Sequence, residues 1–352
     1  MKKKTYGPAL YFASDKNIFD ALIQHKVDAP TLASLFERRN TIVSKKTPRD
    51  ELAEYFSRLT HDYYDHRTIS QKLGSPPRRE RTTSMDLVGK IDPENMRLAL
   101  EEIKKDISAG GDTAHISRNG NNFSILIQYS LIDYKKTEFS QVQIKDGVIE
   151  FIQTTEGYLI RNAQNEFMNT VRDEVVAKVD KEIEGLEKVT VSLYEIIDPK
   201  LRTKFFIDLI NGLEGFSRRD VSDVYVHKPK PTKSDHLELT SDDDETHIEK
   251  VLLKGNGVTR SALLIELTSD EYYIVKIGWT MQRTLGNGDI YDIEVLFADP
   301  VNCTGFSILL KGVYPYVDGK PGKRRPPLKS EIDEISRIVE TTARSLMASL
   351  KA

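Results

Sequence analysis

Apolar residues recur at helical spacing through the first part of the chain, and no strand-like alternation interrupts them. The spacing predicts helices over residues 17–26 and 30–39, a third helix after Pro48 and a short fourth helix at 68–73. Pro48 suits the first turn of a helix, where its missing N–H would have no intrahelical partner. We therefore expect residues 1–73 to form a small helical domain.

The stretch at residues 74–90 is rich in proline and arginine and predicts a linker, because it offers little to bury. Pro93 then opens a helix that runs to residue 109, and from residue 113 the hydrophobic period changes to two. Strands are expected at 122–132, 138–144 and 147–153, with hairpin turns at Asn119-Gly120 and Asp146-Gly147.

Longer elements fill the rest of the chain. The pattern predicts helices at 163–184, 199–213, 259–267 and 329–350. It predicts strands at 188–196, 221–227, 248–254, 271–280, 289–298 and 304–316. The polar, acidic residues 228–247 are typical of a mobile surface insertion. Short turns favour antiparallel pairing, so the fold class is α+β: a small helical N-terminal domain followed by mostly antiparallel sheets with packed helices.

This order of elements predicts several domains. They are the helical domain 1–73, the linker 74–90, an α+β unit at 91–196 and a second α+β unit at 197–352. The second unit carries the acidic insertion and the C-terminal helix. A loose similarity of sheet followed by helix links 113–184 with 271–350 and favours two related units.

The composition is that of a folded protein, with 39% hydrophobic and 30% charged residues. It excludes a disordered chain, a coiled-coil rod and a collagen-like fibre. No run approaches the roughly 20 apolar residues that span a bilayer, so we expect no membrane contact. The single Cys303 excludes an intrachain disulfide and a cysteine-based zinc site, which indicates a reducing, cytoplasmic compartment.

Charge is distributed unevenly along the chain. Residues 1–90 contain 17 Lys or Arg against 11 Asp or Glu, a net charge of +6. The whole chain has a net charge of −3, so the remaining residues carry −9. A positive head on an acidic body is typical of proteins that contact polyanions locally.

The pattern at residues 31–59 joins two short helices through an extended basic segment. Leu32 and Phe36 on the first helix and Leu52 and Phe56 on the second supply the apolar contacts of the pair. This pattern resembles a SAP-type helix–extended–helix module, a small DNA-binding fold. Cations at the start of a helix favour phosphate. The candidate nucleic-acid-binding residues here and in the linker are Arg38, Arg39, Lys45, Lys46, Arg49, Arg78, Arg79 and Arg81.

These features predict a non-enzymatic subunit that binds or senses DNA through the duplex backbone or its ends, without base specificity. A small helical head on an α+β body is loosely similar to accessory subunits of bacterial phage-defence systems. That resemblance implies antiviral defence within a protein complex, and a protein partner such as a nuclease subunit. A homo-oligomer is compatible with it, and no cofactor is expected.

Residues 61–66 form a second notable run, His61-Asp62-Tyr63-Tyr64-Asp65-His66. On a helix His61 and Asp65 share one face, but zinc requires three or four ligands. Tyr63 and Tyr64 are candidates for stacking on bases. We expect instead that both tyrosines cover the core of the helical domain.

The rival hypothesis is a metal-dependent nuclease that uses Asp289, Asp292 and Glu294 on one strand. Asp292 and Glu294 are two apart and point the same way, and such carboxylates with a lysine bind Mg²⁺ and activate water. Restriction-type nucleases have Asp…(Asp or Glu)-x-Lys, whereas Leu296 stands two residues after Glu294. Lys276 on the preceding strand is the candidate replacement, and the alternative interpretation is an exposed sheet face.

A third hypothesis is an assembly scaffold that does not bind nucleic acid and that dimerises or docks through residues 329–350. The sequence contains no G-x-x-x-x-G-K-[ST] phosphate loop and no G-x-G-x-x-G after a strand. Its histidines and Cys303 suggest no nucleophilic triad. No catalytic signature therefore favours an enzyme.

Overall fold

The computed structural model describes residues 13–73, 80–135, 139, 141–183, 185–229, 248–255, 257–286, 288–317 and 319–351. The chain separates into two compact units. Unit 1 comprises Met1–Arg78, Arg97–Ser117 and Ser124–Val148, and unit 2 comprises Arg79–Met96, Arg118–Phe123 and Ile149–Ala352. All but the first two residues of the acidic insertion expected at 228–247 lie outside the described residues, as do Arg78 and Arg79.

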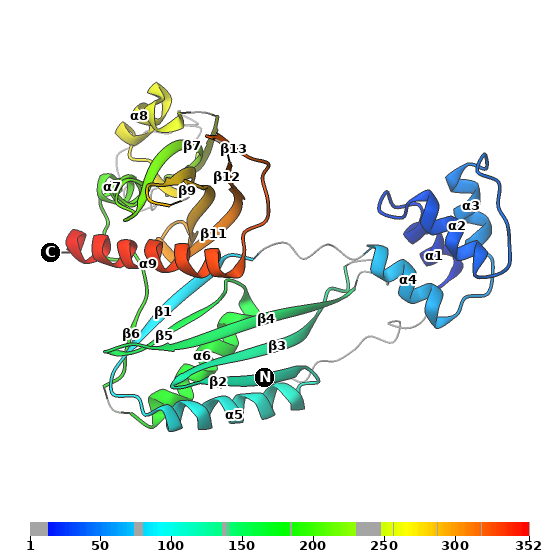
Figure 1. Ribbon diagram of the computed structural model, residues 1–352, viewed down its shortest axis with the longest axis horizontal. Helices are drawn as coiled ribbons and strands as arrows, with labels where there is room; N and C mark the ends of the chain where they lie inside the picture. The colour runs from blue at the N-terminus through cyan, green and yellow to red at the C-terminus, as the bar shows by residue number, and fades with distance from the viewer. Residues whose placement is uncertain are drawn as a thin grey trace, which may run out of the picture. The chain divides into compact units, whose positions relative to one another are not determined.

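Unit 1 begins with four short helices that share a core (Figure 1). They are α1 (Asp15–Leu22), α2 (Ala29–Glu37), α3 (Arg49–Ser57) and α4 (Tyr63–Leu73). Ser14 forms a capping box with Asn17 at the start of α1, and the Asp28 side chain accepts the Thr31 N–H at the start of α2. Leu22, Leu32, Leu35, Phe36, Phe56 and Ile69 fill the space between the helices. The expected helical N-terminal region is confirmed.

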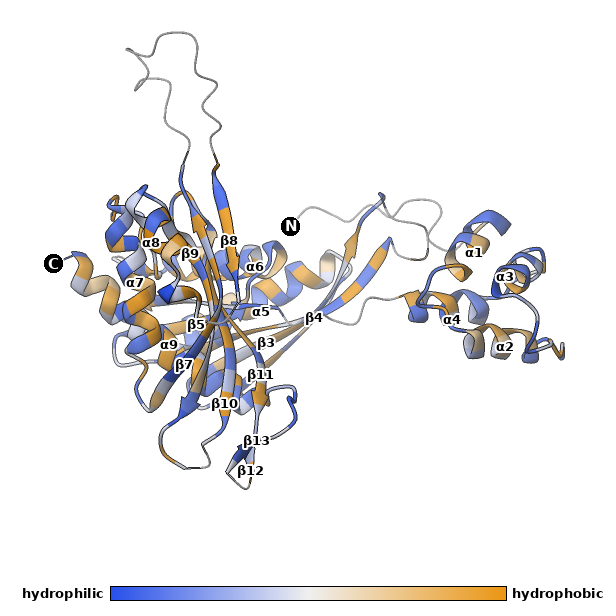
Figure 2. Ribbon diagram, turned by 90° about the horizontal axis from the view of Figure 1, so that it is seen from above, coloured by the Kyte–Doolittle hydropathy of each residue, from blue (hydrophilic) through white to orange (hydrophobic). Residues whose placement is uncertain are grey.

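The next elements are α5 (Pro93–Ala109), β2 (Thr113–Asn119), β3 (Asn122–Ile132) and β4 (Val142–Gln153), with β3 between β2 and β4. Buried and more exposed positions alternate along much of β3 and β4, and both strands carry polar as well as apolar residues (Figure 2). The turn at Asn119-Gly120 forms as expected, because Gly120 adopts a φ of 61°.

The turn expected at Asp146-Gly147 is wrong. β4 continues through both residues. Gly147 occupies the row of buried positions that Ile149 and Phe151 extend, so the alternation passes through the pair without a reversal of the chain. The strands expected at 138–144 and 147–153 are therefore one strand.

The predicted linker at 74–90 is wrong in its second half, because residues 82–88 form strand β1 (Thr82–Val88). Met85 and Leu87 are buried at alternate positions. β1 pairs antiparallel with β5 (Gly157–Ala163) and β6 (Glu187–Val189). The apolar alternation of β1 is weak in the sequence, because only two large apolar residues form it and an arginine-rich stretch precedes it.

Unit 2 is built on an antiparallel sheet with the strand order β5-β1-β11-β10-β9-β7-β8. The strands not yet given are β7 (Phe216–His227), β8 (Lys250–Lys254), β9 (Tyr273–Arg283), β10 (Ile290–Asp299) and β11 (Thr304–Tyr314). A short hairpin follows, of β12 (Tyr316–Val317) and β13 (Lys320–Pro321). Of the strand expected at 188–196 only β6 forms. The expected α+β class with mostly antiparallel sheets is confirmed.

Several helices of unit 2 lie against the sheet or at its edge (Figure 1). They are α6 (Glu166–Lys181), α7 (Pro199–Asn211), α8 (Ala262–Ser269), the short 3-10 helix η3 (Val258–Arg260) and α9 (Lys329–Lys351). Phe205 of α7 and Val339 of α9 share one core with Trp279, Ile293 and Val295 of the sheet. The C-terminal helix α9 thus packs within its own unit. Among the described residues, no helix combines the length and the apolar character that a membrane crossing requires.

The order of elements repeats along the chain. Strand, helix, four strands and helix occur first as β1-α5-β2-β3-β4-β5-α6 and again as β6-α7-β7-β9-β10-β11-α9. In the second series β8, η3 and α8 are inserted between β7 and β9, and β12 and β13 are inserted between β11 and α9. This repeat extends the similarity noted between 113–184 and 271–350.

Candidate functional sites

The two arginines that follow α2 bind carboxylates within the four-helix region α1–α4, which is called the helical module from here on. Arg39 Nη2 donates to the Asp65 carboxylate, and Arg38 Nη1 lies 3.5 Å from Asp65 Oδ1. Arg38 Nη2 also lies 3.7 Å from Asp62 Oδ2. Because the Asp65 side chain is only 3% exposed, its charge needs these partners inside the fold. Arg38 and Arg39 therefore hold α2 to the start of α4.

Arg49 also supports the fold of the helical module. Its Nη2 donates to the carbonyl oxygen of Leu22 at 2.8 Å and to that of Gln24. Leu22 ends α1 and Gln24 lies just beyond it, at the end of the helix where carbonyls lack intrahelical partners. Arg49 thus joins the end of α1 to the first turn of α3.

Lys45 and Lys46 are placed differently from these arginines. Both are exposed, on the segment 41–48 that joins α2 to α3. Val43 packs against the core and anchors this segment, whereas the side chain of Ile42 is 97% exposed. The fold therefore presents two adjacent ammonium groups to solvent at a fixed place in the module.

The N-terminal end of α3, which follows these lysines, is poorly suited to bind an anion by itself. Its N-cap is Pro48, which makes no side-chain cap. Asp50 and Glu51 occupy the first turn, so their negative charge offsets the favourable helix dipole. On segment 41–48, the lysines rather than the N-terminus of α3 would therefore have to bind a phosphate.

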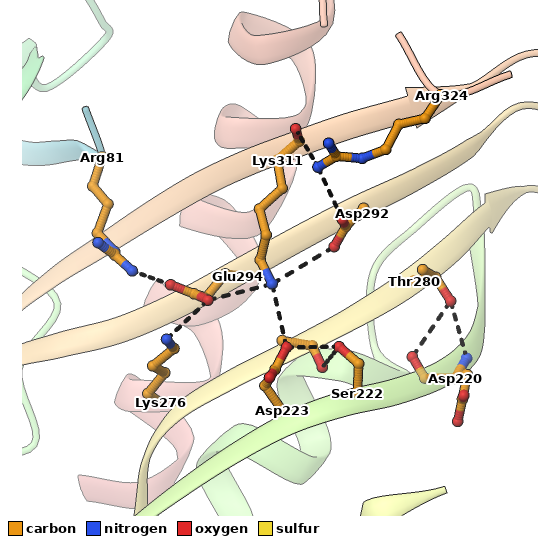
Figure 3. Close-up of polar contacts among 11 residues, drawn as sticks. Arg81, Asp220, Ser222, Asp223, Lys276, Thr280, Asp292, Glu294, Lys311 and Arg324 are labelled. Atoms are coloured by element: carbon orange, nitrogen blue, oxygen red, sulfur yellow. Dashed lines mark hydrogen bonds and ion pairs between the residues drawn. The ribbon is translucent and has the colours of Figure 1, made fainter. Parts of the chain in front are cut away.

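Arg81 belongs to a charge cluster in unit 2 (Figure 3). It donates to Glu294, which Lys276 Nζ approaches at 3.0 Å. Lys311 Nζ lies 3.3 Å from Glu294 Oε2, 3.4 Å from Asp223 Oδ2 and 3.7 Å from Asp292 Oδ1. The name carboxylate–lysine cluster is used below for Asp223, Lys276, Asp292, Glu294 and Lys311.

Strand alternation places this cluster on the sheet face opposite α7 and α9. Ile293 and Val295 enter the core beneath those helices, so Asp292 and Glu294 point to the other face. Gly278 on β9 makes room for the cluster. A Cβ atom there would lie 3.1 Å from Lys311 Nζ and 3.2 Å from Asp223 Oδ2.

The environment of the cluster favours the charged forms of Glu294 and Lys311. Burial alone would raise the pKa of Glu294, but the hydrogen bond from Lys276 and the charges of Lys276, Lys311 and Arg81 lower it below its usual range. Burial would likewise lower the pKa of Lys311, but its three carboxylate neighbours raise it. Each charge is stabilised by the others, as in a structural ion-pair network.

The residues named in the nuclease hypothesis are only partly brought together by the fold. Lys276 reaches Glu294 from the neighbouring strand, as the replacement for the missing lysine requires. Asp289 is used differently, because its carboxylate accepts the N–H of Tyr316 at 2.8 Å. Arg324 Nη2 approaches Asp292 Oδ2 at 3.3 Å. Among the described residues, no group of three or more His, Cys, Asp or Glu side chains is arranged to hold a metal ion.

Sequence reasoning missed Lys311 and Asp223. The pairing of β10 with β11 shifts register between Asp292 and Ile293, and this irregularity brings Lys311 to the carboxylates. Gly278, inside a strand, is a sequence signal of close approach there.

The tyrosines of the 61–66 run do not cover the core, so that expectation is wrong. Tyr63 is 65% exposed and Tyr64 is 60% exposed. α4 begins at Tyr63 and turns Asp65, Ile69 and Leu73 inward instead. The inward row starts with a carboxylate because Arg38 and Arg39 neutralise it.

In comparisons with known proteins, no protein-family model and no curated protein matches the chain.

Proposed function

We propose that this chain is a non-enzymatic nucleic-acid-binding protein that contacts the phosphate backbone of duplex DNA through residues 41–48 of its helical module. The supporting observation is that the basic residues of the helical module fall into two groups, one that supports the fold and one that faces solvent. Arg38, Arg39 and Arg49 hold the helices together, whereas Lys45 and Lys46 face solvent on the connecting segment. Lysine is a point charge without a fixed fork of donors, which suits phosphate rather than base edges.

Binding of this kind is independent of sequence and weakens with salt, because each neutralised phosphate releases a counterion. Two lysines alone give modest affinity. A protein partner, such as a nuclease subunit of a bacterial defence complex, would add the catalytic activity. A cytoplasmic location fits such a role.

The experiment is fluorescence anisotropy of the full chain with a labelled duplex. The double variant Lys45→Glu with Lys46→Glu is compared with Lys104→Glu and Lys105→Glu, an adjacent lysine pair on α5 with the same change in charge. We expect the first variant to lose binding at moderate salt and the second to change it little. Equal losses would show a general charge effect and overturn the proposal. Absence of binding by the unaltered chain would also overturn it, and would favour the scaffold hypothesis.

A metal-dependent nuclease is the second candidate, favoured by the 3.0 Å separation between Lys276 Nζ and Glu294 Oε2. Lys311 already lies among the three carboxylates to which Mg²⁺ would have to bind. The purified chain is incubated with linear and circular duplex DNA, with and without Mg²⁺. Mg²⁺-dependent cleavage that Asp292→Ala abolishes would establish this candidate and contradict the non-enzymatic proposal.

A further inference from the structure

Two adjacent tyrosines at the start of α4 present their rings to solvent. Tyr63 and Tyr64 are 65% and 60% exposed, and their ring centroids are 5.6 Å apart at an interplanar angle of 77°. Large aromatic side chains gain free energy when buried, so two exposed neighbouring rings are a recurrent mark of binding surfaces.

The surroundings of the rings hold them in place. Asp62 Oδ1 accepts the Asp65 N–H at 2.8 Å and so fixes the first turn of α4. Arg38 Cζ lies 5.6 Å from the centroid of the Tyr64 ring, and Arg38 is itself held by Asp62 and Asp65. A rigid helix start with an attached guanidinium reduces the entropy lost on binding.

A cavity of about 230 Å³ lies in the same region. Its lining residues are Arg38, Arg39, Thr60, His61, Asp62 and Asp65. The two guanidinium charges are balanced by the two carboxylates, so this surface exerts little net pull on an anion. Attraction there must come from the faces of the rings and from the guanidinium stacked on one of them.

We propose that Tyr63 and Tyr64 stack on unpaired nucleobases, so that the helical module prefers nucleic acid with a single-stranded segment. The inference rests on the proposed function, in which Lys45 and Lys46 bind the phosphates of the same ligand. Aromatic faces with an adjacent cation are the means by which proteins bind single strands without sequence preference, because every base offers a π-face. A protein partner is the competing ligand, and the test separates the two.

The test measures binding of the full chain to a labelled oligothymidine of about 20 nucleotides, which is longer than the roughly 4–16 nucleotides of known single-strand sites, and to a blunt duplex of similar length. Tyr63→Ala with Tyr64→Ala should weaken oligothymidine binding at least about thirtyfold, since each lost base–tyrosine stack is worth about 1–3 kcal/mol and every 1.4 kcal/mol is tenfold in affinity. Duplex binding should change less than about twofold, because paired bases are not available to the rings.

Three controls make the result specific. Tyr63→Phe with Tyr64→Phe keeps the rings and should retain binding. Tyr194→Ala removes a tyrosine of unit 2 with a similar exposure of 64% and should have no effect. Asp62→Asn retains a cap but removes the charge that pairs with Arg38, and should strengthen oligothymidine binding.

Each outcome bears on a different claim. Loss in the alanine variant with retention in the phenylalanine variant supports stacking. Unchanged oligothymidine binding in the alanine variant, or an equal loss in the Tyr194 variant, overturns the inference and leaves Tyr63 and Tyr64 to a protein ligand. If Lys45→Glu with Lys46→Glu abolishes duplex binding while the tyrosine variants change nothing, the proposed function holds and only the stacking inference fails.

Discussion

Arg161 on β5 and Glu340 on α9 form an ion pair that is closed off from solvent within unit 2. Arg161 Nη2 lies 2.7 Å from Glu340 Oε2 and Arg161 Nε lies 3.3 Å from Oε1, while the two side chains are 7% and 1% exposed. The neighbouring Asn162 bonds to Asn169 of α6 at 2.9 Å. Because successive residues of a strand point to opposite faces, α9 and α6 cover opposite faces of β5.

The first prediction concerns this pair. Glu340→Leu alone should lower the free energy of unfolding of unit 2 by about 3–5 kcal/mol, because it leaves the Arg161 charge buried without a partner. Adding Arg161→Met should restore much of the loss. Urea unfolding followed by fluorescence of Trp279, the only tryptophan and a fully buried one, measures both. A double variant no more stable than the single one would contradict the prediction.

The second prediction concerns Gly157, which begins β5. Its φ is 151°, and a Cβ atom there would lie 2.0 Å from the carbonyl oxygen of Leu87 on β1. Gly157→Ala should therefore destabilise unit 2 by about 2–4 kcal/mol, since the β1–β5 pairing must open. Gly215→Ala is the matched control. Its φ is 78° with no neighbouring atom within 4 Å, so it should cost about 1–2 kcal/mol from backbone strain alone.

The third prediction concerns Glu294. Glu294→Gln should destabilise unit 2 by about 1–3 kcal/mol at neutral pH, because Arg81, Lys276 and Lys311 lose a buried partner. The pKa of Glu294 is lowered in the folded chain. Its contribution is therefore complete above its unfolded pKa of about 4.3 and is lost as pH falls through the folded value.

Trp279 fluorescence in urea at pH 7 and at acidic pH tests this dependence. The difference between the unaltered chain and Glu294→Gln should shrink on acidification. The exposed Glu195 serves as control, and Glu195→Gln should change stability by less than about 0.5 kcal/mol at either pH. A Glu294→Gln variant as stable as the unaltered chain at pH 7 would show that the cluster is not maintained for stability.

The fourth prediction concerns His227, which is 3% exposed and whose Nδ1 lies 3.2 Å from the Tyr273 hydroxyl. Burial lowers the pKa of this imidazole, with a further contribution from the charge of Lys250. The unfolded chain therefore binds a proton near pH 6.5 that the folded chain does not, and stability falls as pH drops below about that value. Unfolding midpoints between pH 8 and pH 5.5 should decline less steeply in His227→Gln than in the unaltered chain. The exposed His115 is the control, and His115→Gln should leave the slope unchanged.

Local signals in the sequence predict elements better than they predict sites. Helix α5 has the bounds that Pro93 and Gly110 suggest, because both ends are set by neighbouring residues. Strand β1 is not predicted from the sequence, because Met85 and Leu87 alone form its apolar alternation and an arginine-rich stretch precedes them. The strand's place in the sheet depends on partners far along the chain.

The roles of the charged residues depend even more on distant contacts. Arg39 donates a hydrogen bond to Asp65, 26 residues away, and Arg81 donates one to Glu294, 213 residues away. A basic run therefore looks the same in the sequence whether its side chains bind ligand or support the fold. Only the structure separates Lys45 and Lys46 from the arginines beside them.

The salt dependence of duplex binding tests the central claim most directly. The association constant of the full chain is measured over a range of salt concentrations, for the unaltered chain and for Lys45→Gln with Lys46→Gln. If both lysines contact phosphates, the log–log slope should become shallower by about 2, since each neutralised phosphate contributes about 0.9. An unchanged slope would contradict the account, because binding would then use charges other than those on segment 41–48.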